Sequence, residues 1–83
     1  MKLAEIFKEL EAENAASILK HGLWRDNYTD SEQKDAIEGE FCEWYTAHLD
    51  GNIHGEHGEL AELLDLANVC IRRYMFLTGE KLA

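Results

Sequence analysis

Four acidic residues stand in two pairs whose spacing suits metal chemistry. Glu40 and Glu43 are three residues apart, and so are Glu62 and Asp65. Residues three apart share one face of a helix, with their Cβ atoms about 5–6 Å from each other. Four carboxylates in one pocket would repel, at roughly 3 kcal/mol for two unit charges about 5 Å apart. A hard divalent cation offsets that repulsion, and Mg²⁺ leaves coordination positions for substrate phosphates and water.

Helices are expected to position these pairs. The chain has no proline, and residues that favour helix predominate, which together indicate long helices with short connections. Gly22 is a natural end for a first helix. Thr29 and Glu32 have the spacing of a capping box at the start of a second, and the glycine-rich segment 50–58 separates the second from a third. We therefore predict an all-α fold in a single domain, with helices over residues 2–21, 30–49 and 59–77.

The predicted third helix is apolar on nearly all sides. Val69 and Phe76 lie opposite its main apolar arc, interleaved with Glu62 and Asp65. A helix of this kind is expected to be buried, and charges on it must then be paired, hydrated or metal-bound. The main arc consists of Leu60, Leu63, Leu64, Ala67, Cys70, Ile71 and Tyr74.

Antiparallel packing of the second and third helices would bring the two acidic pairs together. Ala36 and Ala47 lie beside Glu40 on its helix and would permit a close approach. A chain of 83 residues buries only about 60–65% of its unfolded surface. We therefore expect a three-helix chain whose helical bundle is completed by homodimerisation.

The charge of the chain limits its partners. The formal net charge is −9, and between Asp26 and Ile71 twelve acidic residues accompany one basic residue, Lys34. Direct nucleic-acid binding requires lysine and arginine at the phosphates and is not expected. Divalent metal binding remains compatible with this charge, and so does imitation of nucleic acid toward a basic partner protein.

Several features favour a reducing, cytoplasmic location. Cys42 and Cys70 stand singly in apolar helical stretches and are expected to be reduced core thiols. The N-terminal segment is amphipathic and charged throughout, unlike a signal peptide. No apolar run approaches the roughly 20 residues that a membrane span requires, so no membrane association is expected.

The two acidic pairs resemble the motif of a known family. Glu40-x-x-Glu43, 18 intervening residues and Glu62-x-x-Asp65 are similar to the motif of the MazG-type all-α nucleoside triphosphate pyrophosphohydrolases. That motif is E-E-x-x-E, a gap of about this length, and E-x-x-D, on two consecutive helices. The resemblance covers roughly residues 32–74. Gly39 stands where the family has the first Glu of its pair.

The resemblance implies an activity, a cofactor and an assembly. It implies water attack at the α-phosphorus of an NTP or dNTP, which gives a monophosphate and pyrophosphate. Mg²⁺, or Mn²⁺ in its place, would be held by Glu40, Glu43, Glu62 and Asp65, and one of these carboxylates would orient or deprotonate the water. The implied architecture is a helical bundle completed by dimerisation.

Other residues are candidates for binding the nucleotide. Asn68 and Arg72 continue the stripe of Asp65 along the third helix, as polar residues often do in members of that family. On charge alone, Lys34, Arg72 or Arg73 could contact phosphates. Trp24 or Trp44 could stack on the base.

Simpler interpretations of the same residues remain open. Glu40 and Glu43 could form a solvated helix face, and Glu62 and Asp65 could form a buried salt bridge with Arg72 or Arg73. The histidines of the glycine-rich segment are expected at the surface rather than in a zinc site. The rival function is a non-enzymatic acidic inhibitor or interaction protein that imitates the charge of DNA. Convergent carboxylates would favour the metal site, and dispersed ones the charge mimic.

Overall fold

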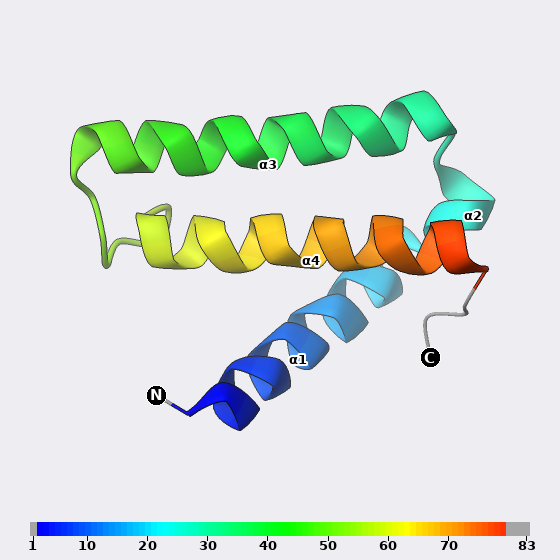
Figure 1. Ribbon diagram of the computed structural model, residues 1–83, viewed down its shortest axis with the longest axis horizontal. Coiled ribbons are helices and arrows are strands. Elements are labelled where there is room, and N and C mark those ends of the chain that lie inside the picture. Colours follow the sequence, from blue (N-terminus) through cyan, green and yellow to red (C-terminus); the bar gives the residue numbers. More distant parts are fainter. Residues whose placement is uncertain (1, 80–83) are drawn as a thin grey trace.

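The computed structural model describes residues 2–79, apart from the side chain of Arg25, and it is helical throughout (Figure 1). No strand occurs within these residues, so the predicted all-α class is confirmed. The three long helices begin and end within one residue of the ranges expected from the sequence. A short additional helix lies between the first two long helices, in a segment that was expected to be an irregular connection. The helices are α1 Leu3–His21, α2 Trp24–Asn27, α3 Asp30–Asp50 and α4 Glu59–Thr78.

Local sequence explains where α3 begins and ends. The Thr29 hydroxyl accepts a hydrogen bond from the Glu32 backbone N–H at 3.1 Å, and a Glu32 carboxylate oxygen accepts one from the Thr29 N–H at 3.0 Å. This reciprocal pair is the capping box that the sequence predicts. At the other end Gly51 adopts a left-handed conformation, with φ 66°, which glycine does without steric cost.

The helix α3 lies antiparallel beside α4, and α1 crosses α4 at an angle (Figure 1). The N-terminal half of α1 points away from the pair. One guanidinium nitrogen of Arg73 in α4 lies 2.7 Å from Asp30 and 2.7 Å from the amide oxygen of Gln33, which is fully buried. These contacts fix the start of α3 against the end of α4.

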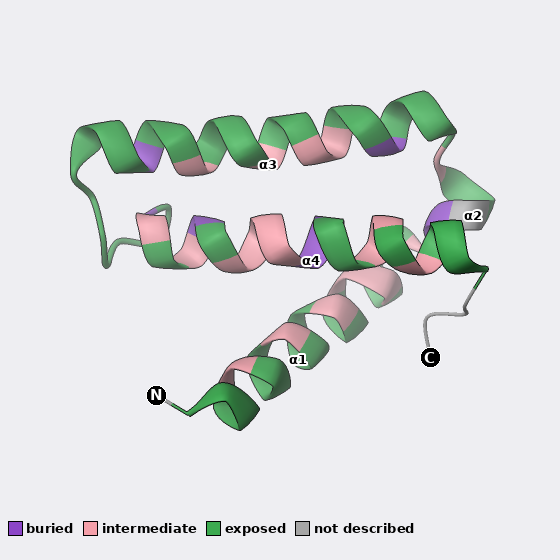
Figure 2. Cartoon of the chain, viewed as in Figure 1, coloured by how far each residue is buried: buried purple, intermediate pink, exposed green. Residues whose placement is uncertain are grey.

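The buried face of α4 is its polar face, contrary to expectation. Glu62, Asn68 and Val69 are its buried residues, and they face the other helices (Figure 2). The main apolar arc lies largely at the surface, where Leu60 is 52% and Tyr74 68% exposed. The physical reason is that α1 and α3 both pack on the carboxylate-bearing side, and none of the helices within residues 2–79 covers the arc.

Both cysteines are free and exposed. The prediction that Cys42 and Cys70 are core thiols is therefore wrong. Cys70 belongs to the uncovered arc of α4, and Cys42 lies on the part of α3 that α4 leaves open. Among the described residues, no helix combines the length and apolar character needed to cross a membrane.

Replacing Gly39 by Ala is expected to raise the free energy of unfolding by about 0.5–1 kcal/mol. Gly39 lies within α3, and a Cβ built there meets no atom within 4 Å, so only the gain in helix propensity remains. Gly51→Ala is the matched control. Its Cβ also meets nothing, but φ is +66°, so this variant should lose stability. Urea unfolding of both variants measures the two effects, and a destabilised Gly39→Ala protein would contradict the assignment of this position.

Candidate metal centre

Three carboxylates from two helices meet within one chain. Glu40 of α3 and Glu62 and Asp65 of α4 each place one oxygen within 4.8 Å of the others. The antiparallel packing of α3 and α4 produces this convergence, and buried Ala47 on α3 keeps the helices close. We refer to these three residues as the carboxylate cluster.

Glu43 adjoins the cluster from the surface. It is exposed and lines a cavity together with Glu62. Its negative charge is among the causes that raise the pKa of each of the three cluster carboxyls. Glu43 is therefore electrostatically part of the site, although its own carboxylate is not among the three that converge.

The cluster contains polar atoms that no protein group satisfies. One oxygen of Glu40 and one of Glu62 are buried without a hydrogen-bond partner, and Glu62 is only 3% exposed. Leaving a buried acceptor unsatisfied costs about 1–3 kcal/mol, and more when the group is charged. An oxygen-seeking cation would satisfy both atoms at once, so the residues present fit Mg²⁺ or Mn²⁺.

Burial and mutual repulsion shift the acidity of the cluster. Burial, followed by the charges of Glu43 and Asp65, raises the pKa of Glu40 to about 7. Burial and then the charge of Glu43 also raise the pKa of Glu62 and of Asp65. The positive charge of Arg72 lowers the pKa of Asp65, but it does not offset the rise caused by burial and Glu43. In the metal-free cluster the pKa of Glu40 therefore lies near neutral pH, and those of Glu62 and Asp65 lie above their ordinary values.

A polar groove of about 450 Å³ lies beside the cluster. Asn68 and Arg72, two of the substrate ligands expected from the sequence, both line it, and α1 anchors each of them. The Asn68 amide nitrogen donates to a Glu13 carboxylate oxygen at 2.9 Å, and Arg72 Nε donates to the Asn14 side-chain oxygen at 2.8 Å. The groove lining comprises Glu13, Ala16, Ser17, Lys20, His21, Glu40, Asp65, Asn68, Val69 and Arg72.

Among the described residues, neither Glu62 nor Asp65 forms a close ion pair with Arg72 or Arg73, although the charge of Arg72 acts on Asp65. Arg73 pairs with Asp30 instead, and Arg72 donates to Asn14. Glu62 contacts His57, whose Nδ1 lies 3.5 Å from a Glu62 oxygen.

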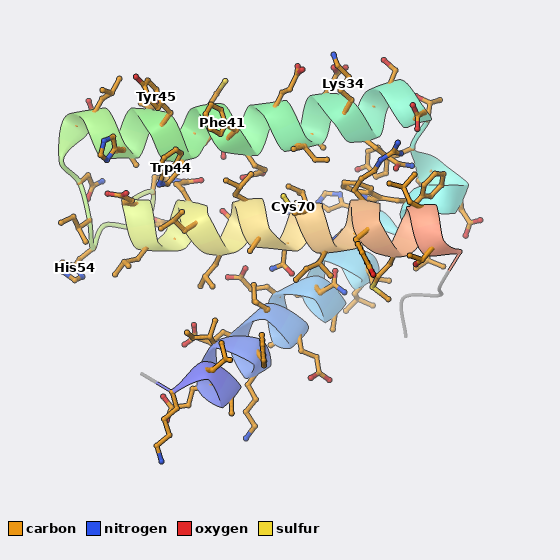
Figure 3. The ribbon with its side chains drawn as sticks, in the orientation of Figure 1. Lys34, Phe41, Trp44, Tyr45, His54 and Cys70 are labelled. Carbon is orange, nitrogen blue, oxygen red and sulfur yellow. The ribbon has the colours of Figure 1, made fainter. Side chains whose placement is uncertain are left out.

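Two proposed substrate ligands lie elsewhere in the structure. The Lys34 ammonium lies 3.2 Å from Glu38 on the outer face of α3, directed away from α4 (Figure 3). Trp24 is 5% exposed and packs beside the ring of Tyr28. Neither residue lines the groove, because Lys34 follows the solvent face of α3 and α2 turns Trp24 into the core.

The structure adds basic residues that the sequence analysis did not propose as ligands. Lys20 and His21, in the last turn of α1, line the groove opposite Asp65 and Arg72. Their spacing carried no signal, because the crossing of α1 over α4 brings together residues more than 40 positions apart.

No protein-family model, curated protein or solved structure matches the chain, so functional inference rests on this geometry.

The metal-free protein is expected to lose stability as pH rises from about 4.5 to about 7. The pKa of Glu40 is about 7 in the folded protein, whereas the ordinary pKa of a glutamate is 4.5. The folded state therefore holds more protons than the unfolded state in this window, and stability falls as pH rises through it. Partial exposure screens the effect, so we expect a drop in Tm of about 5 °C. Calorimetry in the presence of a chelator should show this fall of Tm with pH in wild type and a smaller fall in Glu40→Gln. Equal dependence of Tm on pH in the two proteins would contradict the raised pKa of Glu40.

Proposed function

We propose that this chain is a metal-dependent nucleoside triphosphate pyrophosphohydrolase of the MazG type that works as a homodimer. The observation that carries the proposal is the convergence of Glu40, Glu62 and Asp65, with oxygens within 4.8 Å of one another and two of the buried oxygens unpartnered. Dispersed surface acids would have favoured the charge mimic instead. Convergence within one chain supports the metal site.

The proposed reaction is attack of water on the α-phosphorus of an NTP or dNTP. A bond forms between the water oxygen and the α-phosphorus, and the bond from that phosphorus to the oxygen bridging to the β-phosphorus breaks. Pyrophosphate leaves with that oxygen, and the proton of the water passes to a carboxylate. The products are a nucleoside monophosphate and pyrophosphate.

The cluster residues divide between holding the cation and moving the proton. Glu62 and Asp65, with Glu43 beside them, would hold Mg²⁺ or Mn²⁺. The bound ion would neutralise the phosphate oxygens and favour ionised carboxylates. Glu40 is the proposed proton acceptor, because its carboxylate belongs to the cluster and one of its oxygens is buried without a partner.

The groove beside the cluster is the proposed place of the nucleotide. Arg72 and Lys20 line it from α4 and α1 and supply the positive charge that phosphate oxygens require. The amide oxygen of buried Asn68 has no hydrogen-bond partner, and it is the acceptor that we propose for a hydrogen bond from the nucleotide. In this arrangement phosphates meet basic groups on one side and the cation on the other.

The exposed arc of α4 supports a homodimer. Leu60, Leu63, Ala67, Cys70 and Tyr74 follow one another at alternating spacings of three and four, the heptad pattern of helices that pack along a seam. Leu60, Leu63, Cys70 and Tyr74 are exposed in the single chain, and the small residues Ala67 and Cys70 permit close approach.

A second copy suits this surface better than a charged partner does. None of the arc residues carries a charge, although the chain as a whole has a net charge of −9. Two copies related by a two-fold axis would cover the same stripe on each other. The shared core would also relieve the thin stability margin of an 83-residue chain.

The proposed activity is tested by incubating the protein with a panel of NTPs and dNTPs plus Mg²⁺ and separating the products by chromatography. Monophosphate and pyrophosphate from wild type, with far less from Glu43→Gln, would support the proposal and name the substrate. If no nucleotide is turned over, the result favours the charge-mimic function, and a binding assay with basic partner proteins becomes the next step.

A further inference from the structure

The outer side of α3 carries a row of apolar residues that the proposed function does not use. Phe41, Tyr45 and Leu49 are 49%, 47% and 67% exposed. They follow one another at intervals of four, which places them on successive turns of one side of the helix. The rings of Phe41 and Tyr45 stack, with centroids 6.2 Å apart and an angle of 18° between their planes. We refer to these three residues as the apolar ridge.

The apolar ridge lies apart from the rest of the molecule. Tyr45 points away from α4, whereas Trp44 points toward α4 (Figure 3) and its Nε1–H donates to a Glu59 oxygen at 3.2 Å. No ridge residue lines the groove beside the carboxylate cluster or the cavity of Glu43 and Glu62. Exposed apolar side chains that stand singly are ordinary, but a contiguous row indicates an interaction surface.

Negative charge flanks the ridge at both ends. Asp35 and Glu38 lie within two turns before Phe41, Asp50 follows Leu49 directly, and all three carboxylates are exposed. The negative end of the α3 helix dipole adds to the charge beside Leu49. The whole of α3 contains seven carboxylates and one lysine, and Glu38 already holds that lysine at 3.2 Å.

This charge decides which kind of partner fits. Nucleic acids and anionic membrane surfaces carry the same sign of charge and would be repelled. A second copy that packed through α3 on a two-fold axis would bring the carboxylates of both helices together, unlike a contact through the uncharged arc of α4. A partner with apolar and positively charged groups complements both features of the surface.

We propose that the apolar ridge of α3 docks an amphipathic basic helix of a partner protein. Apolar side chains of that helix, spaced at i, i+4 and i+7, cover the ridge. Arginines at its two ends pair with Asp35 or Glu38 and with Asp50, and an arginine also stacks on the exposed ring of Tyr45. This docking does not require hydrolysis, because no ridge residue belongs to the carboxylate cluster.

A synthetic peptide is the probe for the ridge. It is a fluorescein-labelled helix of about four turns, with leucines along one side and arginines toward both ends, and fluorescence anisotropy at physiological salt measures its binding. Wild type should bind it, and a peptide with glutamate in place of each arginine should not bind. Tyr45→Ser and Leu49→Ser should each weaken binding at least about tenfold, because each removes an apolar anchor.

Leu19→Ser is the matched control. Leu19 is an exposed leucine of α1, at 91%, so this variant makes the same change as Leu49→Ser on another helix and should bind the peptide as wild type does. Failure of wild type to bind, or equal affinities of Leu49→Ser and Leu19→Ser, would overturn the proposal. Weaker binding in Glu38→Gln with wild-type affinity in Tyr45→Ser would also overturn it, because charge alone would then explain the contact.

Two further measurements separate this proposal from the others. Sedimentation of Tyr45→Ser should give the oligomeric state of wild type, and dissociation of the variant would show that a second copy covers the ridge, which overturns the proposal. The nucleotide assay should show unchanged turnover in Tyr45→Ser. Ridge-dependent peptide binding by a protein that hydrolyses no nucleotide would leave the docking surface standing and remove only the proposed function.

Discussion

Glu62→Gln is expected to abolish metal-dependent hydrolysis while making the metal-free protein more stable. Glu62 is the most buried member of the carboxylate cluster, with one oxygen unpartnered. The amide keeps its shape but removes the charge that repels Glu43 and Asp65. At pH 8 in chelator, Tm should rise by roughly 4–8 °C, which corresponds to about 1 kcal/mol in a domain of this size. Turnover should fall at least about 100-fold, because a ligand to the cation is lost.

The opposite directions of the two effects make this variant informative. A merely damaged protein would lose activity and stability together. Glu9→Gln, which removes an exposed charge from α1, is the control and should change neither quantity. Unchanged turnover in Glu62→Gln, or a fall in Tm without metal, would contradict the assignment of Glu62 to a cation site.

Leu63→Glu is expected to raise the dissociation constant of the proposed homodimer at least about 100-fold. Leu63 lies within the heptad stripe of α4 and is 41% exposed in the single chain. A two-fold interface would receive the new carboxylate from both copies, and each buried, unpaired charge costs several kcal/mol. Sedimentation equilibrium over a range of protein concentrations measures the change.

Leu19→Glu is the matched control for the interface. Leu19 is a leucine of α1 that is 91% exposed, and it lies on the side of α1 opposite Ser17, which lines the groove. Its replacement should leave the dimer intact. A wild-type protein that remains monomeric at high concentration, or equal behaviour of the two variants, would contradict the proposed seam.

The helices could be predicted closely because their signals are local. Thr29 and Glu32 form the capping box, and Gly51 and Gly79 end α3 and α4 in the left-handed conformation. Each of these features depends on residues within a few positions of one another. The short helix α2 escaped prediction because one turn contains no hydrophobic period to detect.

Burial could not be predicted from apolar content alone. The arc with Leu60 and Tyr74 looked like the natural core face of α4, yet Glu62, Asn68 and Val69 are the buried residues. Which face of a helix is covered depends on where the other elements pack. An apolar stripe on a helix can therefore indicate a surface that binds a partner, and it does not by itself show that the stripe packs inside the chain.

Part of the candidate site could be predicted from the sequence, and part could not. Spacing alone placed the pairs Glu40–Glu43 and Glu62–Asp65 on facing helices, since two periodic pairs and one short loop suffice for that prediction. Of these four residues, Glu43 stays at the surface outside the cluster. Lys20 enters the groove only through the crossing of α1 over α4, and His57 reaches Glu62 only through the fold of the loop. Such contacts between distant or irregular segments leave no periodic trace in the sequence.

Hydrolysis in ¹⁸O-labelled water tests the central claim most directly. With the nucleotide that the panel identifies and Mg²⁺ present, mass spectrometry of the products locates the oxygen supplied by water. Attack at the α-phosphorus predicts one ¹⁸O in the nucleoside monophosphate and none in pyrophosphate. Label in pyrophosphate, release of orthophosphate as the first product, or no turnover of any nucleotide would contradict the account.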